Sequence, residues 1–186
     1  MSIMGNNFLN QAINEKGLSA PNQILSYMNV AISGSLGQNS RNYGDTEVIV
    51  QDGMDIALVV VDYSTNKIEF SGAQRPLLLI SGNNIEEYKG DRFPVGGSTY
   101  GSHKRYSVEN ISFKPNDSIY LFSDGYSDQF GGAKNKKFKY SKLKELILSG
   151  RKLSMDEQKN QIQEAFDIWK GDQEQLDDIC VFGLRL

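Results

Sequence analysis

The chain has 186 residues, of which 39% are hydrophobic and 23% are charged. This composition suits one folded domain with an ordinary core and argues against extensive disorder. The formal net charge of -3 argues against a nucleic-acid partner, because proteins that bind nucleic acids usually present a strongly basic surface.

Few residues are available for cysteine or histidine chemistry. The single cysteine, Cys180, excludes an intrachain disulfide framework and a cysteine-rich zinc site, and its apolar neighbours predict a buried, inert thiol. The single histidine, His103, argues against Ser–His–Asp or Cys–His catalysis. No apolar run approaches the roughly 20 residues that span a bilayer, and no signal peptide is visible, which predicts a cytoplasmic location.

Two helices are predicted at the start of the chain. Apolar residues at near-helical spacing indicate a helix over residues 1–16 that ends at Gly17. A second helix is predicted from Pro21, because proline suits the first turn of a helix. Its apolar stripe comprises Ile24, Leu25, Met28, Ile32 and Leu36. Residues 37–53 are polar and contain glycine, which predicts a loop.

Short strands dominate the middle of the sequence. They are predicted over residues 56–61, 68–70, 76–80, 85–88, 106–113 and 119–123. Tight turns join several of them, so the sheets should be antiparallel, and a glycine-rich loop is predicted over residues 89–104. Helices are predicted over residues 141–148 and 155–169, with Ser154 and Glu157 forming a capping box, and the last strand over residues 179–186. This order predicts an α+β layered fold.

Two acidic segments lie at ends of predicted strands. Asp124 and Gly125 follow the strand that ends near Ser123, and Asp177 and Asp178 precede the last strand. Carboxylates at strand ends suit a hard divalent cation, which prefers oxygen ligands. The alternative is that Asp124 and Gly125 form a plain β-turn and that the second segment is a solvated loop.

Two further segments have an uneven charge. Residues 134–144 are basic and residues 172–178 are acidic. Charge runs of this kind usually belong to solvated loops and helix faces, and the basic run is interpreted in that way here.

Several segments, taken in order, resemble motifs of the PPM family of metal-dependent serine/threonine protein phosphatases, which are also called type 2C-like. The likeness is to the bacterial branch typified by the stage II sporulation phosphatase and the stress-response phosphatases. It extends over residues 1–186 and depends on residues 68–79, 93–97, 119–132, 136–138, 169–172 and 175–183. It implies a single αββα sandwich domain, with two antiparallel sheets flanked by helices.

One motif of the family is not found. The resemblance places an Asp-x-x-Gly-His-Gly segment ahead of the first long helix, and the residues before that helix here do not match it. The resemblance therefore implies a partial domain without the first metal motif and the N-terminal strands. Whether this chain alone is active is left open.

The resemblance also implies a mechanism, in which water activated by two Mn²⁺ or Mg²⁺ ions attacks phosphorus directly. Asp124 and Asp177 match the metal ligands. Gly125, Asp178 and Asp128 are secondary candidates, as ligands or as groups that support the ligands. Arg75 is a weaker candidate for a phosphate contact, against a packing or solvent role. Asp55 is interpreted as structural or subfamily-specific, with a site role as the smaller alternative.

The function implied is hydrolysis of phosphoserine or phosphothreonine on a regulatory protein in bacterial signal transduction, with an anti-anti-sigma-like protein as the expected substrate. An upstream sensor domain is expected, which would make the chain the cytoplasmic part of a sensor that could be membrane-anchored, and a homodimer is considered. Two alternatives stay open: a non-catalytic phosphatase-fold module that binds a partner or dimerises, and an unrelated α+β binding domain.

Overall fold

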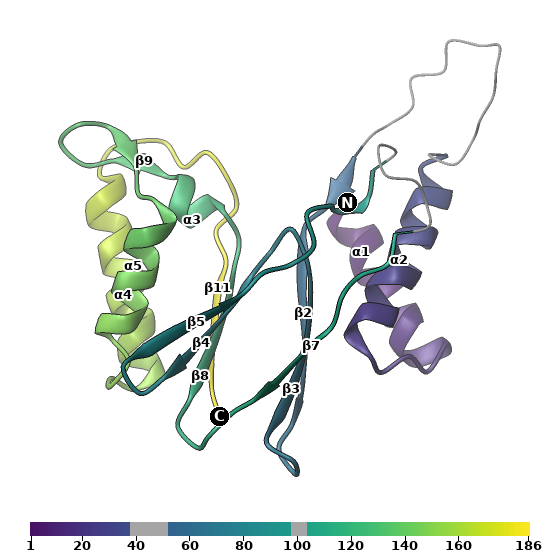
Figure 1. Ribbon diagram of the computed structural model, residues 1–186. Coiled ribbons are helices and arrows are strands. Elements are labelled where there is room, and N and C mark those ends of the chain that lie inside the picture. Colours follow the sequence, from purple (N-terminus) through teal and green to yellow (C-terminus); the bar gives the residue numbers. More distant parts are fainter. Residues whose placement is uncertain (38–51, 98–103) are drawn as a thin grey trace. The chain divides into compact units, whose positions relative to one another are not determined.

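The computed structural model describes residues 1–37, 52–97 and 104–186, which form two compact units (Figure 1). The first unit comprises Met1–Pro76 and Lys89–Ser112, and the second comprises Leu77–Tyr88 and Phe113–Leu186. Each unit contains a hydrophobic core of its own. His103 and nearly all of the loop predicted over residues 37–53 lie outside the described residues.

The helices of the first unit agree with the predictions. Helix α1 (Ser2–Asn10) continues into the π-helix η1 (Gln11–Glu15), and helix α2 covers Pro21–Ser35. Gly17 has a φ of +64°, as expected for a residue that ends a helix. Four residues of the predicted stripe of α2 are buried, namely Ile24, Leu25, Met28 and Ile32.

Two antiparallel sheets complete the first unit. The three-stranded sheet has the order β2-β3-β7, and the two-stranded sheet pairs β1 with β6. Their bounds are β1 Gly53–Met54, β2 Ile56–Asp62, β3 Lys67–Ala73, β6 Val95–Gly96 and β7 Glu109–Ser112. Helix α2 packs against both sheets. The predicted loop over residues 89–104 therefore contains a strand, and the strand predicted over residues 106–113 is shorter than expected.

The second unit is built on a four-stranded antiparallel sheet of order β11-β8-β4-β5. The bounds are β4 Leu77–Ser81, β5 Asn84–Tyr88, β8 Ser118–Phe122 and β11 Val181–Arg185. A small hairpin pairs β9 (Phe130–Gly131) with β10 (Lys136–Lys137). This hairpin was not predicted, because two-residue strands leave no recognisable alternation in the sequence.

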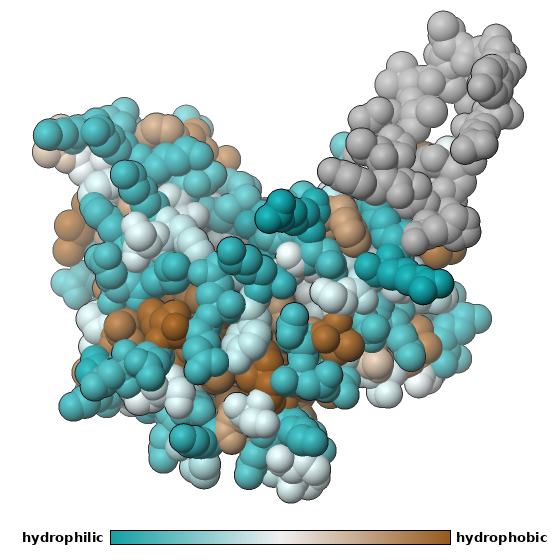
Figure 2. Space-filling model, in the orientation of Figure 1, coloured by the Kyte–Doolittle hydropathy of each residue, from teal (hydrophilic) through white to brown (hydrophobic). Residues whose placement is uncertain are grey.

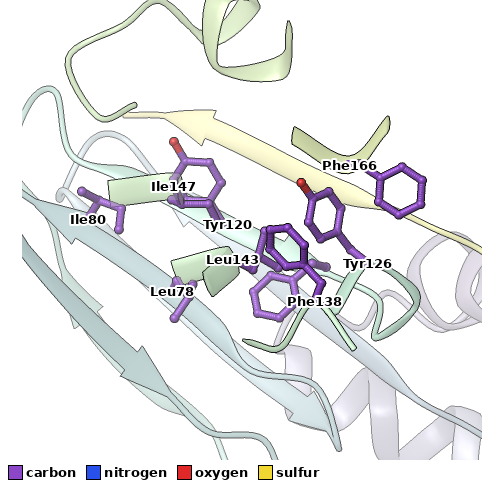
Figure 3. Packing of buried hydrophobic residues seen from close by; sticks show 9 residues of the cluster. Leu78, Ile80, Tyr120, Tyr126, Phe138, Leu143, Ile147 and Phe166 are labelled. Carbon is purple, nitrogen blue, oxygen red and sulfur yellow. The ribbon is translucent and has the colours of Figure 1, made fainter. Parts of the chain in front are cut away.

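Helices α4 (Tyr140–Ser149) and α5 (Met155–Lys170) lie side by side against the four-stranded sheet (Figure 1). Their apolar faces meet the sheet in one core, where the rings of Tyr126, Phe138 and Phe166 gather (Figure 3). Tyr126 lies 5.0 Å from Phe138 and 5.2 Å from Phe166 between ring centroids. Ser154 and Glu157 form the predicted capping box at the start of α5.

The α+β class and the antiparallel sheets with accompanying helices are confirmed. The assignment of residues 1–186 to a single phosphatase domain stays a prediction. Among the described helices, none combines the length and the apolar character that crossing a bilayer requires.

Candidate functional site

Pairing between β8 and β11 brings the two acidic segments together. Phe122 and Val181 are the last paired residues at this end of the two strands. Beyond them, Ser123 donates its backbone N–H to the carbonyl of Cys180 at 2.9 Å, and its hydroxyl donates to the carbonyl of Asp178 at 2.9 Å. The Ser123 hydroxyl also accepts the N–H of Cys180 at 2.9 Å. This serine, which the sequence analysis missed, therefore binds the second acidic segment to the end of β8.

Gly125 allows the two segments to approach closely. A Cβ atom placed on Gly125 would lie 2.5 Å from the carbonyl oxygen of Asp178, a distance that real Cβ atoms essentially never show. Only glycine fits here without displacing the neighbouring backbone. Gly125 thus allows a close approach between two backbone segments.

Asp124 lies at the N-terminus of the one-turn helix α3 (Gly125–Asp128) and is half-buried. Its carbonyl accepts the backbone N–H of Asp128 at 2.9 Å and the hydroxyl of Ser127 at 3.0 Å. The alternative of a plain β-turn at this position is therefore wrong. The chain turns through a short helix that fixes the backbone of Asp124.

Asp128, Asp177 and Asp178 are exposed, and the carboxylates of Asp128 and Asp177 have partners of their own. Asp128 accepts a bond from Lys137 Nζ at 2.9 Å, with side-chain exposures of 52% and 49%. Asp177 Oδ1 accepts the backbone N–H of Asp178 at 2.7 Å. Asp124, Asp177 and Asp178 thus belong to adjoining segments at one end of the sheet, and Asp128 lies one helical turn from Asp124.

The type of these donors suits Mn²⁺ or Mg²⁺, since carboxylate and carbonyl oxygens are the ligands that hard cations prefer. Within residues 1–37, 52–97 and 104–186, no three Asp, Glu, His or Cys side chains lie close enough together to hold a metal ion. Asp124 and Asp177 therefore stay predicted ligands, of the type required by a cation that takes one or two carboxylates and completes its coordination with water.

Arg75 belongs to the first unit and pairs with Asp55, with 2.8 Å between Nη2 and Oδ2. Their side chains are 19% and 31% exposed. This ion pair agrees with the structural interpretation of Asp55. A phosphate contact for Arg75 stays a prediction.

The prediction of a buried thiol is wrong, because Cys180 is exposed. Cys180 precedes β11, and β11 lies at the edge of the sheet among the described strands. Phe182, two residues further on, is 51% exposed. An apolar run at a sheet edge is therefore covered less completely than the sequence suggests.

Comparisons with known proteins show a family and a shared fold. The model of the family described as Stage II sporulation protein E (SpoIIE) matches residues 1–186. No curated protein sequence matches the chain.

Among solved structures, the chain is similar to the SiaA-PP2C domain of Pseudomonas aeruginosa, with a TM-score of 0.85 and 23% identity over 100% of this chain and 68% of that chain. It is similar to the PP2C phosphatase domain and regulatory fragment of SpoIIE from Bacillus subtilis, with a TM-score of 0.68 and 18% identity over 99% and 48% of the two chains. It is also similar to the PPM Ser-Thr phosphatase MsPP from Mycobacterium smegmatis, with a TM-score of 0.60 and 15% identity over 98% of this chain and 80% of that chain. These identities show a shared fold. With the family match, they lead to one conclusion: the chain belongs to the SpoIIE family of PP2C-type phosphatase domains.

Proposed function

We propose that this chain is a protein phosphatase domain that hydrolyses phosphoserine or phosphothreonine on a regulatory protein, with an anti-anti-sigma-like protein as its substrate. The carrying observation is that the backbone of Gly125, next to Asp124, lies against Asp178. This contact brings two acidic segments to one end of the sheet in a member of a phosphatase family. Hydrolysis of a phosphate ester at a divalent cation needs such a collection of oxygen donors.

In this proposal, Asp124 and Asp177 hold Mn²⁺ or Mg²⁺, and Asp178 belongs to the segment that positions Asp177. A bound cation would lower the pKa of a coordinated water and neutralise charge on the phosphate. The remaining residues position these groups. The Ser123 hydroxyl fixes the backbone at Asp178, α3 fixes the backbone of Asp124, and Lys137 orients Asp128 through the ion pair.

The test uses Asp124→Asn and Asp177→Asn, because an amide keeps the shape of the side chain and removes its charge. Mn²⁺ affinity is measured by calorimetry, and hydrolysis of a phosphoserine peptide is followed by phosphate release. We expect each variant to lose about 10- to 100-fold in Mn²⁺ affinity, the range that loss of a group supporting a metal site already produces. Hydrolysis should fall with it.

Asp156→Asn is the matched control. Asp156 is exposed in the first turn of α5. Leu153, three residues before Asp156, accepts a bond from Arg185 at the far end of β11, so α5 begins near the end of the sheet opposite the candidate site. If Mn²⁺-dependent hydrolysis is unchanged in both Asp124→Asn and Asp177→Asn, the site assignment is wrong.

A non-catalytic module that binds a partner or dimerises is the second candidate. The observation that favours it is that both carboxylates already have partners within the chain. Asp128 forms an ion pair with Lys137, and Asp177 accepts the N–H of Asp178. This candidate predicts that phosphorylated partners bind without phosphate release at any Mn²⁺ concentration. Sedimentation analysis over a range of concentrations would test the dimer.

A further inference from the structure

The β9–β10 region carries a concentrated positive charge. We define the basic hairpin as residues 130–139, which include β9, β10 and the residues up to the start of α4. It contains four lysines and no acidic residue. All four lysines are exposed, namely Lys134, Lys136, Lys137 and Lys139. Figure 2 shows mainly hydrophilic surface at the upper left, where Figure 1 places the loop of β9.

The base of the basic hairpin is held rigidly. Gly132 donates its N–H to the carbonyl of Trp169 at 2.8 Å, and Phe138 donates its N–H to the carbonyl of Gln129 at 2.9 Å. The indole Nε1 of Trp169 donates to the same Gln129 carbonyl at 3.1 Å. A Cβ atom on Gly131 would collide with the backbone of Trp169. The lysines are thus presented from a fixed support, which lowers the entropy that binding must overcome.

The basic hairpin adjoins the candidate site directly. Lys137 Nζ lies 2.9 Å from the carboxylate of Asp128, and the N–H of Asp128 donates to the carbonyl of Asp124 at 2.9 Å. Lys139 donates its N–H to the carbonyl of Ser127, also within α3, at 2.8 Å. The basic hairpin is therefore bonded to α3, the short helix that directly follows Asp124, the first candidate metal ligand.

This charge is only partly neutralised inside the chain. Of the four lysines, Lys137 alone forms an ion pair among the residues that the structure describes. Because the chain as a whole is acidic, with a net charge of -3, the hairpin is a local positive region on a negative protein. Such a region attracts an anionic partner and orients it during association.

Lys139 adopts a backbone conformation that favours glycine. Its φ is 79° and its ψ is 141°, a region in which a side chain is strained. The conformation is fixed by the bond to Ser127 and by the start of α4. Glycine would relieve the strain at this position, so the lysine here has a cost in stability. Strain of this kind is typical of residues that serve function.

We propose that the basic hairpin binds acidic residues that flank the phosphorylated side chain of the protein substrate and thereby selects that substrate. This inference rests on the proposed phosphatase function. The cation site would hold the phosphate, and Lys134, Lys136 and Lys139 would contact carboxylates next to it. The substrate class is therefore an acidic phosphoprotein segment.

The experiment measures binding by fluorescence anisotropy, with two labelled phosphoserine peptides as probes. One peptide has glutamates on both sides of the phosphoserine, and the other has glutamines at the same positions. We expect the full chain to prefer the acidic peptide by about tenfold at low salt, with the preference falling as ionic strength rises. The double variant Lys134→Glu/Lys136→Glu should lose this preference.

The double variant Lys114→Glu/Lys152→Glu is the matched control, with the same change in charge. Lys114 precedes β8, and Lys152 lies in the turn between α4 and α5. Arg185, at the far end of β11, donates to the carbonyls of Arg151 and Leu153 on either side of Lys152. Both control lysines therefore lie near the end of the sheet opposite Asp124. This variant should keep the full preference for the acidic peptide.

Lys139→Gly separates function from folding. We expect a higher Tm, since glycine relieves the strain, together with a weaker preference for the acidic peptide.

Equal affinity of the original chain for both peptides would overturn the inference. A second outcome would also overturn it: the chain shows no peptide preference but binds phosphatidylserine vesicles through Lys134 and Lys136. The hairpin would then bind a membrane surface. Peptide preference without any hydrolysis would contradict the phosphatase proposal, and only the binding of acidic segments by the hairpin would then stand.

Discussion

The carbonyl oxygen of Asp178 lies 2.5 Å from the point where a Cβ atom on Gly125 would be. The smallest substitution, Gly125→Ala, therefore forces the acidic segments apart. We expect Mn²⁺-dependent hydrolysis to fall at least about tenfold, because a small displacement of ligands costs that much at a metal site. Activity assays and thermal denaturation check this. Normal activity in a normally folded Gly125→Ala variant would show that the contact does not matter.

A second glycine gives the opposite expectation. Gly34 lies within α2, is exposed, and has open space where a Cβ atom would be. We expect Gly34→Ala to raise the free energy of unfolding by about 0.5–1 kcal/mol, because alanine loses less backbone entropy in a helix. Urea denaturation measures it. Destabilisation by this change would contradict the placement of Gly34 in an open helical position.

The start of α5 depends on one serine. Ser154 accepts the N–H of Glu157 at 3.2 Å, and Glu157 accepts the N–H of Ser154 at 2.8 Å. We expect Ser154→Ala to cost about 1 kcal/mol of stability through loss of this cap. Ser141→Ala, on the exposed surface of α4, is the control and should be neutral or slightly stabilising, because alanine favours helix. Equal changes in the free energy of unfolding for the two variants would show that the Ser154 cap does not stabilise α5.

The turn between β2 and β3 predicts a dependence on pH. Hydrogen bonds from Ser64 and then from Thr65 lower the pKa of Asp62 to about 2. Because the folded pKa lies below the unfolded value of about 3.9, the stabilisation is present above about pH 4 and is lost as the pH falls towards 2. Asp62→Asn should therefore be destabilising at pH 7, and the difference should shrink below pH 4.

Urea denaturation at a series of pH values measures the Asp62 effect, and Asp172→Asn in an exposed turn is its control. A destabilisation by Asp62→Asn that is the same at pH 7 and pH 3 would show that the carboxylate charge does not contribute.

The sequence predicted the elements that have long apolar patterns. The apolar stripe of α2 predicts a helix and the β-branched run of β2 predicts a strand. A buried face of a regular element requires apolar residues at regular spacing, which is visible in the sequence. The pairs β1–β6 and β9–β10 were missed, since each strand has two residues. Their existence depends on contacts such as Gly53 with Gly96, which no local pattern contains.

The candidate site was predicted in part for the same reason. Asp124 and Asp178 follow and precede strands that are recognisable by their apolar residues, so their proximity follows once those strands pair. The bonds of Ser123 and the one-turn helix α3 depend on that pairing and could not be read beforehand. Cys180 was placed wrongly because residue type does not reveal which strand lies at the edge of a sheet.

The polypeptide crosses between its two compact units three times, after Pro76, Tyr88 and Ser112. Neither unit can therefore be expressed as one uninterrupted piece. During synthesis, the hairpin of β4 and β5 leaves the ribosome before β7 completes the first unit, and it must wait for β8. The four-stranded sheet closes only after α4 and α5 have been made, since β11 follows both helices. Asp124 therefore emerges well before Asp177, and the site is one of the last features to assemble.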